Sequence, residues 1–243
     1  MRTFNTMLKT ELRLSLRGLD MLIFALIMPV VVTMILGFLY GGKPAYAGAS
    51  YTFLAQSFGA VSTIAICAGG VMGLPLVVSD YRHKGILKRL QVTPVSPGLI
   101  LAVQVTIYAL YAFASLVLVY LTSALFFGFR LEGSWVQFLG GFLLVMLAMF
   151  SIGMMVGGVA ANPKIAGVIA SLLYFPMLLF SGATLPYEVM PPVLQTLADG
   201  MPLTQGIKIL KAATLGLPMR ASLLPAVLLT ALAAVCIGVS IRC

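Results

Sequence analysis

Acidic residues are scarce in this chain, and none of them lies in the middle of a long apolar run. Charged residues make up 9% of the chain, and the acidic ones all lie between the runs or at their ends: Glu11, Asp20, Asp80, Glu132, Glu188 and Asp199. No lysine or arginine lies in the middle of a run either. Proton-coupled transporters generally use an ionisable group within the membrane, and a voltage sensor needs a ladder of arginines. The pattern argues against both classes. A sodium-coupled transporter that binds sodium through backbone carbonyls stays open.

The groups needed for several kinds of catalysis are also missing. His83 is the only histidine, so we expect no histidine-based metal site, and the three cysteines form no CxxC pair. No paired carboxylates or histidine base stand near the middle of a run, as an intramembrane hydrolase would need. The phosphate-binding pattern G-x-x-x-x-G-K-[ST] is absent. We therefore expect no enzyme activity and no cofactor, and energy for uphill movement would come from another polypeptide.

Apolar residues dominate what is present. Hydrophobic residues make up 61% of the chain and the mean hydropathy is +1.10, whereas globular proteins are roughly 45–50% apolar. These values indicate an integral membrane protein. The net charge of +9 would suggest a nucleic-acid partner in a soluble protein. Here the cations lie in short segments between apolar runs, as the positive-inside rule expects, so we expect contact with lipids and no nucleic acid.

Six apolar runs are each long enough for the roughly 20 residues that a helix needs to cross a bilayer. They lie near residues 21–40, 53–79, 99–128, 136–161, 165–187 and 221–241. With both termini on one side, ten of the 15 lysines and arginines fall on that side. The positive-inside rule therefore predicts that both termini are cytoplasmic. The fold prediction is a single all-α membrane domain over residues 1–243 with six transmembrane helices.

An amphipathic segment precedes the first run. Phe4 and three leucines repeat every four positions over residues 4–17, with a parallel stripe of cations. This pattern predicts an interfacial helix within residues 1–20. The rival interpretation is a secretory signal peptide, because Ala45-Tyr46-Ala47 resembles a cleavage site. The first run is longer than the usual apolar part of a signal peptide, which favours a retained first span.

The densest charged patch lies at Ser79–Pro97. On a helical projection its cations occupy one side, and the other arc holds His83, Ile86, Leu87 and Leu90. We predict a short amphipathic helix on the cytoplasmic surface, in a loop at residues 80–97, that ends at two prolines. The alternative is a basic loop that only fixes topology. Such a loop has no need of an apolar face.

A proline-punctuated segment at residues 182–220 precedes the last run on the outer side. Within it Val193–Ala198 and Gln205–Leu215 remain apolar with helical spacing. This pattern predicts two short helices that dip into the outer leaflet as a re-entrant hairpin. A folded cap with no part in transport is the alternative.

Polar, aromatic and glycine residues occur within the runs. Hydroxyls, amides and aromatic rings suit an amphiphilic cargo better than a bare ion, so the candidate path residues are Gln56, Gln104, Tyr108 and Tyr111. Hydrogen bonding between helices is an equal alternative for each. Two GxxxG patterns, at Gly69–Gly73 and Gly153–Gly157, would let helix backbones approach closely.

Together these features resemble the membrane permease of type-2 ABC exporters, a six-span bacterial family that includes drug and antibiotic exporters. The resemblance runs nearly end to end. Its most specific part is similar to the family's coupling helix: Tyr81-Arg82-His83-Lys84-Gly85-Ile86-Leu87-Lys88-Arg89-Leu90, followed by Thr93-Pro94-Val95-Ser96. A second part is similar to the family's outer re-entrant hairpin: Ser181 to Pro186, Met190-Pro191 and Met201-Pro202-Leu203.

The resemblance implies roles for these residues. The segment that would enter a groove of an ABC ATPase subunit consists of Arg82, His83, Lys84, Gly85, Ile86, Leu87, Lys88, Arg89 and Leu90. The outer gate would contain Gly182, Pro186, Pro191 and Pro202. The position of His83 is often acidic in relatives, so this residue departs from the family pattern.

The resemblance also implies an assembly and an activity. Two copies of the permease would form a homodimer in the bacterial inner membrane, with two ATPase subunits that bind ATP and Mg. The expected activity is export of an amphiphilic small molecule such as a drug or antibiotic. Within the family the alternative cargo is a glycan, a lipid or a lipid-linked polymer. Outside the family, an ion channel or an assembly scaffold could also show six spans without internal charges.

Overall fold

The computed structural model describes residues 2–18, 22–45, 51–86, 96–182, 190–218 and 220–242. Within these ranges the chain forms helices, of which η1 and η2 are π-helical and the rest α-helical. In chain order they are α1 (Arg2–Arg17), η1 (Ile23–Ile27), α3 (Met28–Tyr40), α4 (Phe53–Cys67), η2 (Ala68–Gly73), α5 (Leu74–His83), α7 (Pro97–Phe127), α8 (Trp135–Val159), α9 (Pro163–Phe180), α10 (Pro192–Asp199), α11 (Pro202–Thr214) and α12 (Arg220–Arg242).

Six of the described helical stretches are long and apolar enough to cross a bilayer, which confirms the predicted all-α fold with six spans. They are Ile23–Tyr40, Phe53–His83, Pro97–Phe127, Trp135–Val159, Pro163–Phe180 and Ser222–Arg242. The second span is longer than the apolar run predicted at 53–79, because α4, η2 and α5 follow one another without a break. The fifth ends earlier than residue 187, at Phe180, and residues 183–189 lie outside the described part.

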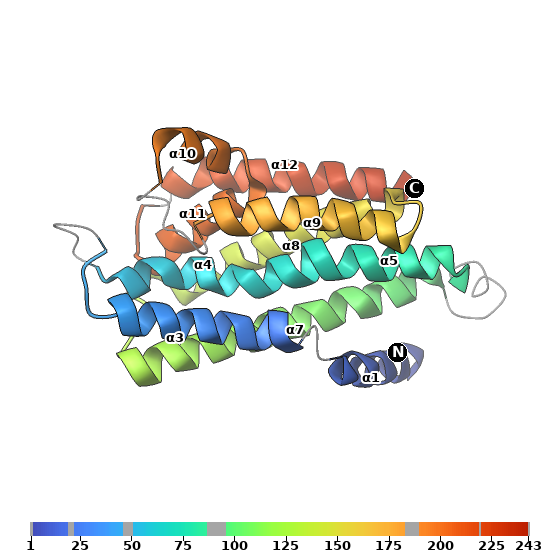
Figure 1. Cartoon of the computed structure of the whole chain (residues 1–243), viewed down its shortest axis with the longest axis horizontal. Helices are drawn as coiled ribbons and strands as arrows, with labels where there is room; N and C mark the ends of the chain where they lie inside the picture. Colours follow the sequence, from blue (N-terminus) through green and yellow to red (C-terminus); the bar gives the residue numbers. More distant parts are fainter. Residues whose placement is uncertain are drawn as a thin grey trace.

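The spans form one elongated bundle with two distinct ends (Figure 1). Both marked termini lie at the end where α5 finishes, and α10 lies at the opposite end. Helix α1 packs against α7 at the end that holds the termini. We call these the terminal end and the α10 end.

Helix α1 is amphipathic, as the sequence predicts. Its residues Phe4, Met7, Leu8 and Leu12 pack against a cluster that includes Val103, Ile107 and Tyr111. The cations Lys9, Arg13 and Arg17 are exposed. Leu16, which the four-residue repeat places on the apolar stripe, is 47% exposed.

The core of the bundle lies around α8, which packs against α12, α11, α5 and η2. At the α10 end it is built from aromatic rings. The ring of Phe58 on α4 stacks on Phe129 at a centroid distance of 4.6 Å and lies 5.4 Å from Phe138 of α8. Large buried rings remove much apolar surface from the surroundings and favour such offset contacts, so they fix α4 against α8.

Glycines bring α8 into backbone contact with η2 and α5. A Cβ on Gly153 would lie 1.8 Å from the carbonyl oxygen of Gly70, and a Cβ on Gly157 would lie 2.7 Å from Cβ of Val78. Both glycines belong to the GxxxG pattern at Gly153–Gly157, which therefore packs two helices of the same chain closely. On the other side of the contact, the π-helical segment η2 itself contains Gly69, Gly70 and Gly73. Single π-turns within α-helices often occur at functional sites.

We predict that Gly153→Leu disrupts this contact. No rotamer removes the clash with a backbone oxygen, so overpacking should lower the melting temperature in detergent by roughly 5–10 °C. Gly140→Leu is the matched control, because it lies on the same helix and a Cβ there meets nothing within 4 Å. Equal melting temperatures for the two variants would show that the glycine contact is incidental.

Candidate functional site

The end of the second span differs from the helix predicted over Ser79–Pro97. Helix α5 runs through Ser79 to His83, so these residues are the last turns of the span. Gly85 then has φ of 65°, a left-handed conformation that glycine adopts freely and that ends an α-helix. The helical arc that joined His83 to Ile86 in the sequence is therefore interrupted at Gly85. Among the predicted coupling residues, Leu87, Lys88, Arg89 and Leu90 lie outside the described residues.

Two described cations of this segment have partners, Arg82 on another helix and Lys84 on its own. Arg82 Nη1 donates to the carbonyl oxygen of Gly157 at 3.3 Å, which ties the end of α5 to the end of α8. Lys84 Nζ lies 2.7 Å from Asp80 Oδ2, one helical turn earlier. His83 is exposed. The polar end of α5 is thus fixed to its neighbours immediately before the segment that the sequence assigns to coupling.

A polar junction joins α1, α5 and α7 at the terminal end. Gln104 Nε2 of α7 donates to Glu11 Oε2 of α1 at 3.0 Å and to the hydroxyl of Tyr81 on α5 at 2.9 Å. The hydroxyls of Ser15 and Tyr111 lie 3.0 Å apart. Gln104 and Tyr111, predicted as path residues, therefore make hydrogen bonds between helices. Glu11 and Tyr81 were not among the predicted site residues, although Glu11 is the only acid on the amphipathic helix.

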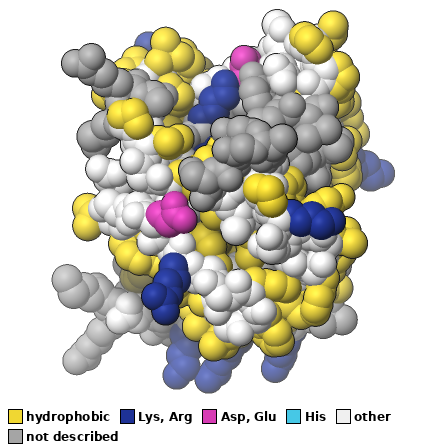
Figure 2. Space-filling view, turned by 90° about the vertical axis from the view of Figure 1, so that its left-hand side faces the viewer, with side chains coloured by type: hydrophobic (Ala, Val, Ile, Leu, Met, Phe, Trp, Pro, Cys, Tyr) yellow, Lys and Arg dark blue, Asp and Glu magenta, His cyan; other side chains and the backbone are white. Residues whose placement is uncertain are grey.

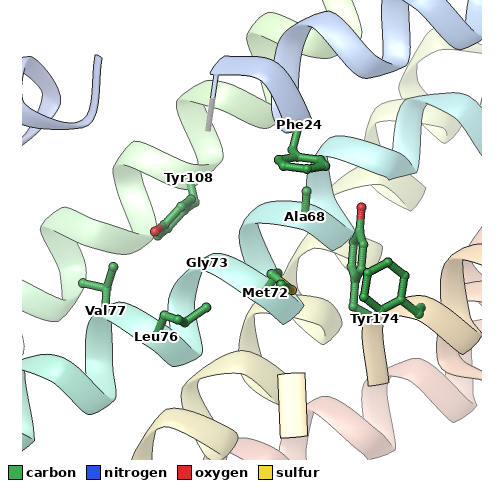
Figure 3. A pocket seen from close by; sticks show the side chains of 9 residues that line it. Phe24, Ala68, Met72, Gly73, Leu76, Val77, Tyr108 and Tyr174 are labelled. Carbon is green, nitrogen blue, oxygen red and sulfur yellow. The ribbon is translucent and has the colours of Figure 1, made fainter. Parts of the chain in front are cut away.

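An apolar cavity of about 380 Å³ lies next to η2 (Figure 3). Residues of η2 and α5 form one wall, with Phe24 of η1 facing them and Tyr108 and Tyr174 at opposite sides. Phe175 of α9 completes the lining. Phe24 is 50% exposed and Phe175 is 53% exposed, so the cavity opens to the surface of the chain between η1 and α9. Its size and apolar lining are typical of small-molecule sites.

A second, more polar cavity of about 430 Å³ adjoins the first at the terminal end. Its polar lining comes from Glu11, Ser15, Asp80, Tyr81 and Gln104. The two cavities share Leu76, Val77 and Tyr108 in their linings. Of the four predicted path residues, Tyr108 and Gln104 line these cavities. Tyr111 and Gln56 are buried on α7 and α4.

The segment before the last span contains the two predicted short helices. Pro192 and Pro202 stand in the first turns of α10 and α11, where the missing N–H has no helical partner. Helix α11 packs against α8, α12 and α4. A Cβ on Gly206 would lie 2.7 Å from Val145 Cγ2, so α11 sits tightly against α8.

The predicted gate residues lie in a turn, at the starts of two helices, or outside the described residues. Gly182 has φ of 91°, so it makes a glycine-type turn after α9. Pro191 caps α10 and Pro202 begins α11. Pro186 lies outside the described residues. Their role as a gate stays a prediction.

The α10 end carries only scattered charge among the residues that Figure 2 colours. Lysine, arginine and acidic side chains are spread over that face, with apolar and uncharged groups between most of them. One ion pair there joins Lys208 Nζ to Asp199 Oδ1 at 2.6 Å and links α11 to the end of α10. Exposed pairs of this kind contribute little to stability, so the packing of α11 is chiefly apolar.

The chain matches a family model described as ABC-2 type transporter over residues 2–215. It is also 29% identical over 133 residues to "Inner membrane transport permease YhhJ" of Escherichia coli (strain K12) and to the protein of the same description from Shigella flexneri. The aligned region covers 54% of this chain and 35% of each relative, so it spans about a third of the length of these curated relatives.

We predict that Gln104→Leu loosens α1 from the bundle. The change removes both hydrogen bonds of the amide and leaves the half-buried Glu11 without that donor. The free energy that holds α1 against the bundle should fall by about 1–3 kcal/mol. The rate of trypsin cleavage after Arg13 and Arg17 should then rise at least fivefold. Thr106→Val is the control, because Thr106 lies on the same helix and its hydroxyl, among the described residues, bonds only to the Ala102 carbonyl. Cleavage at the rate of the control would show that the amide does not hold α1.

Proposed function

The chain belongs to the ABC-2 type transporter family and is thus a membrane subunit of an ABC transporter; we propose that it exports an amphiphilic small molecule, powered by a separate ATPase subunit. The family predicted from the sequence is confirmed by this match. The observation that carries the export proposal is the cavity beside η2, which lies on the same continuous span as the segment assigned to coupling.

The span formed by α4, η2 and α5 supports a coupling mechanism. It is helical from Phe53 to His83, and it lines the apolar cavity with Met72 and both cavities with Leu76. Its terminal end is tied to α8 through Arg82 and to α7 through Tyr81. A force applied beyond Gly85 would therefore move the walls of the cavities as a unit, as packed helices do in other switching transitions.

The dimensions of the cavity favour a small cargo over a polymer. About 380 Å³ with an almost wholly apolar lining suits one compact amphiphile. A glycan would need a path rich in hydrogen-bonding groups. We therefore place the drug-like cargo ahead of the glycan or lipid-linked alternative.

The open side of the cavity supports the homodimer. It opens between η1 and α9, where Phe24 and Phe175 are half exposed. A second copy of the chain would close this side and place the cavity at the interface between permeases. We propose two permease copies and two ATPase subunits per transporter.

The first test concerns the ATPase contact. Lys88→Glu combined with Arg89→Glu reverses the charge of the segment beyond Gly85, so co-purification of the ATPase should fall about tenfold or more because opposed charges become like charges. Membrane insertion should stay unchanged. The control is Lys43→Glu with Arg130→Glu, which makes the same charge change at the α10 end on two exposed residues. Retained ATPase binding with an inverted topology would mean that the basic segment serves only as an anchor.

The second test concerns topology. We propose that the terminal end is cytoplasmic and the α10 end extracytoplasmic, in the bacterial inner membrane, because ten of the 15 lysines and arginines lie on the terminal side. Single cysteines at Gly200 and Gln91 in a cysteine-free background should react with an impermeant maleimide from opposite sides. In intact cells only the Gly200→Cys variant should be labelled. Labelling of both variants from the same side would contradict this topology.

A further inference from the structure

The two cavities that meet at Leu76, Val77 and Tyr108 make one hollow with a polar part and an apolar part. The polar part lies at the junction of α1, α5 and α7, where Glu11 and Asp80 contribute carboxylates. The apolar part lies beside η2 under Phe24 (Figure 3). A ligand that filled both parts would need a polar head and an apolar body.

The charge of the polar part is negative. Asp80 is neutralised by Lys84, whose Nζ lies 2.7 Å from its carboxylate. Glu11 accepts from Gln104, an uncharged donor, and no lysine or arginine of the described residues lies within ion-pair distance of it. A partly buried carboxylate without a cation attracts one strongly, because burial weakens solvent screening. The head that this part favours is therefore a cation.

An unused hydroxyl stands where the two parts meet. Tyr108 is 6% exposed and lines both cavities, yet no described residue makes a hydrogen bond with its hydroxyl. In Figure 3 this hydroxyl points toward the side of the cavity at Val77. The hydroxyl is therefore free to exchange a hydrogen bond with a polar atom of a ligand in the cavity.

The apolar part offers aromatic and thioether surfaces. The rings of Phe24 and Tyr174 face the cavity from η1 and α9, and Met72 lies beside Tyr174. Rings in this arrangement suit a flat aromatic body, and the methionine side chain adapts to its shape.

We propose that the hollow binds a cationic amphiphile, with a protonated amine at Glu11, a polar atom at Tyr108 and an aromatic body beside Met72. This inference rests on the proposed function, since it names the cargo class that enters the export path from the terminal end. An amphiphile with an anionic head would meet the Glu11 carboxylate and be repelled. An uncharged analogue would lose only the contribution of the head.

The test measures binding of dansylcadaverine, a fluorescent aromatic amine, to the whole chain in phosphatidylcholine nanodiscs. N-acetylated dansylcadaverine is the matched neutral probe. Glu11→Gln keeps an oxygen that accepts from Gln104 but removes the charge. We expect its Kd for the amine to rise about tenfold, with the Kd for the neutral probe unchanged.

Three further variants distinguish binding at this site from a change in folding and from a general effect of charge. Glu132→Gln removes one charge from an exposed acid at the α10 end and should leave both affinities unchanged. Ala68→Leu fills the apolar part and should weaken both probes alike. Tyr108→Phe should weaken the amine by a few-fold while the melting temperature stays near that of the unmodified chain. Equal binding of charged and neutral probes by the unmodified chain, or an unchanged Kd in Glu11→Gln, would overturn the proposal.

The binding assay uses no ATPase, so it tests the binding site independently of the export proposal. Selective binding of the amine without ATP-driven transport would support the site and contradict export. ATP-driven transport of both probes at equal rates, with no effect of Glu11→Gln on binding, would support export and contradict the site.

Discussion

The structure depends on the backbone contact between α8 and η2. A methyl group at Gly153 would lie 1.8 Å from the Gly70 carbonyl oxygen, so the two helices meet at this distance only because the side chain is absent. Helix α8 also holds α11 and α12, so the contact fixes the second span relative to the rest of the bundle. It thereby determines which face of η2 is turned away from α8 and lines the cavity through Met72 and Gly73.

The second span connects the apolar cavity to the polar junction at the terminal end. Its middle borders the apolar cavity, and its terminal end joins α1 and α7 through the hydrogen bonds of Gln104. Arg82 ties that end to α8 at Gly157, one helical turn from Gly153. Movement of the segment beyond Gly85 would therefore reach the cavity through helices that are already in contact. In the proposed function, this arrangement would let a chain without a phosphate-binding motif respond to ATP hydrolysis in a partner.

The number of spans could be predicted from the sequence, because the thickness of the bilayer requires each spanning helix to have an apolar run of that length. It also located α10 and α11, since their spacing is helical and prolines mark their starts. It could not show that Gly85 ends α5, because a glycine at φ of 65° and a helical glycine look alike in a sequence. Nor could it separate Gln104 and Tyr111, which join helices, from Tyr108, which lines the cavities. Those roles depend on which neighbouring helix each side chain meets.

We propose that this chain provides a path through the membrane and that another polypeptide provides the energy. It is tested most directly by efflux from proteoliposomes that contain the chain alone, the co-purifying ATPase alone, or both, with a fluorescent amphiphile as cargo. We expect flux that depends on ATP and Mg only when both proteins are present. ATP-dependent flux through the chain alone would contradict it, and so would a complete complex that hydrolyses ATP without moving any amphiphile.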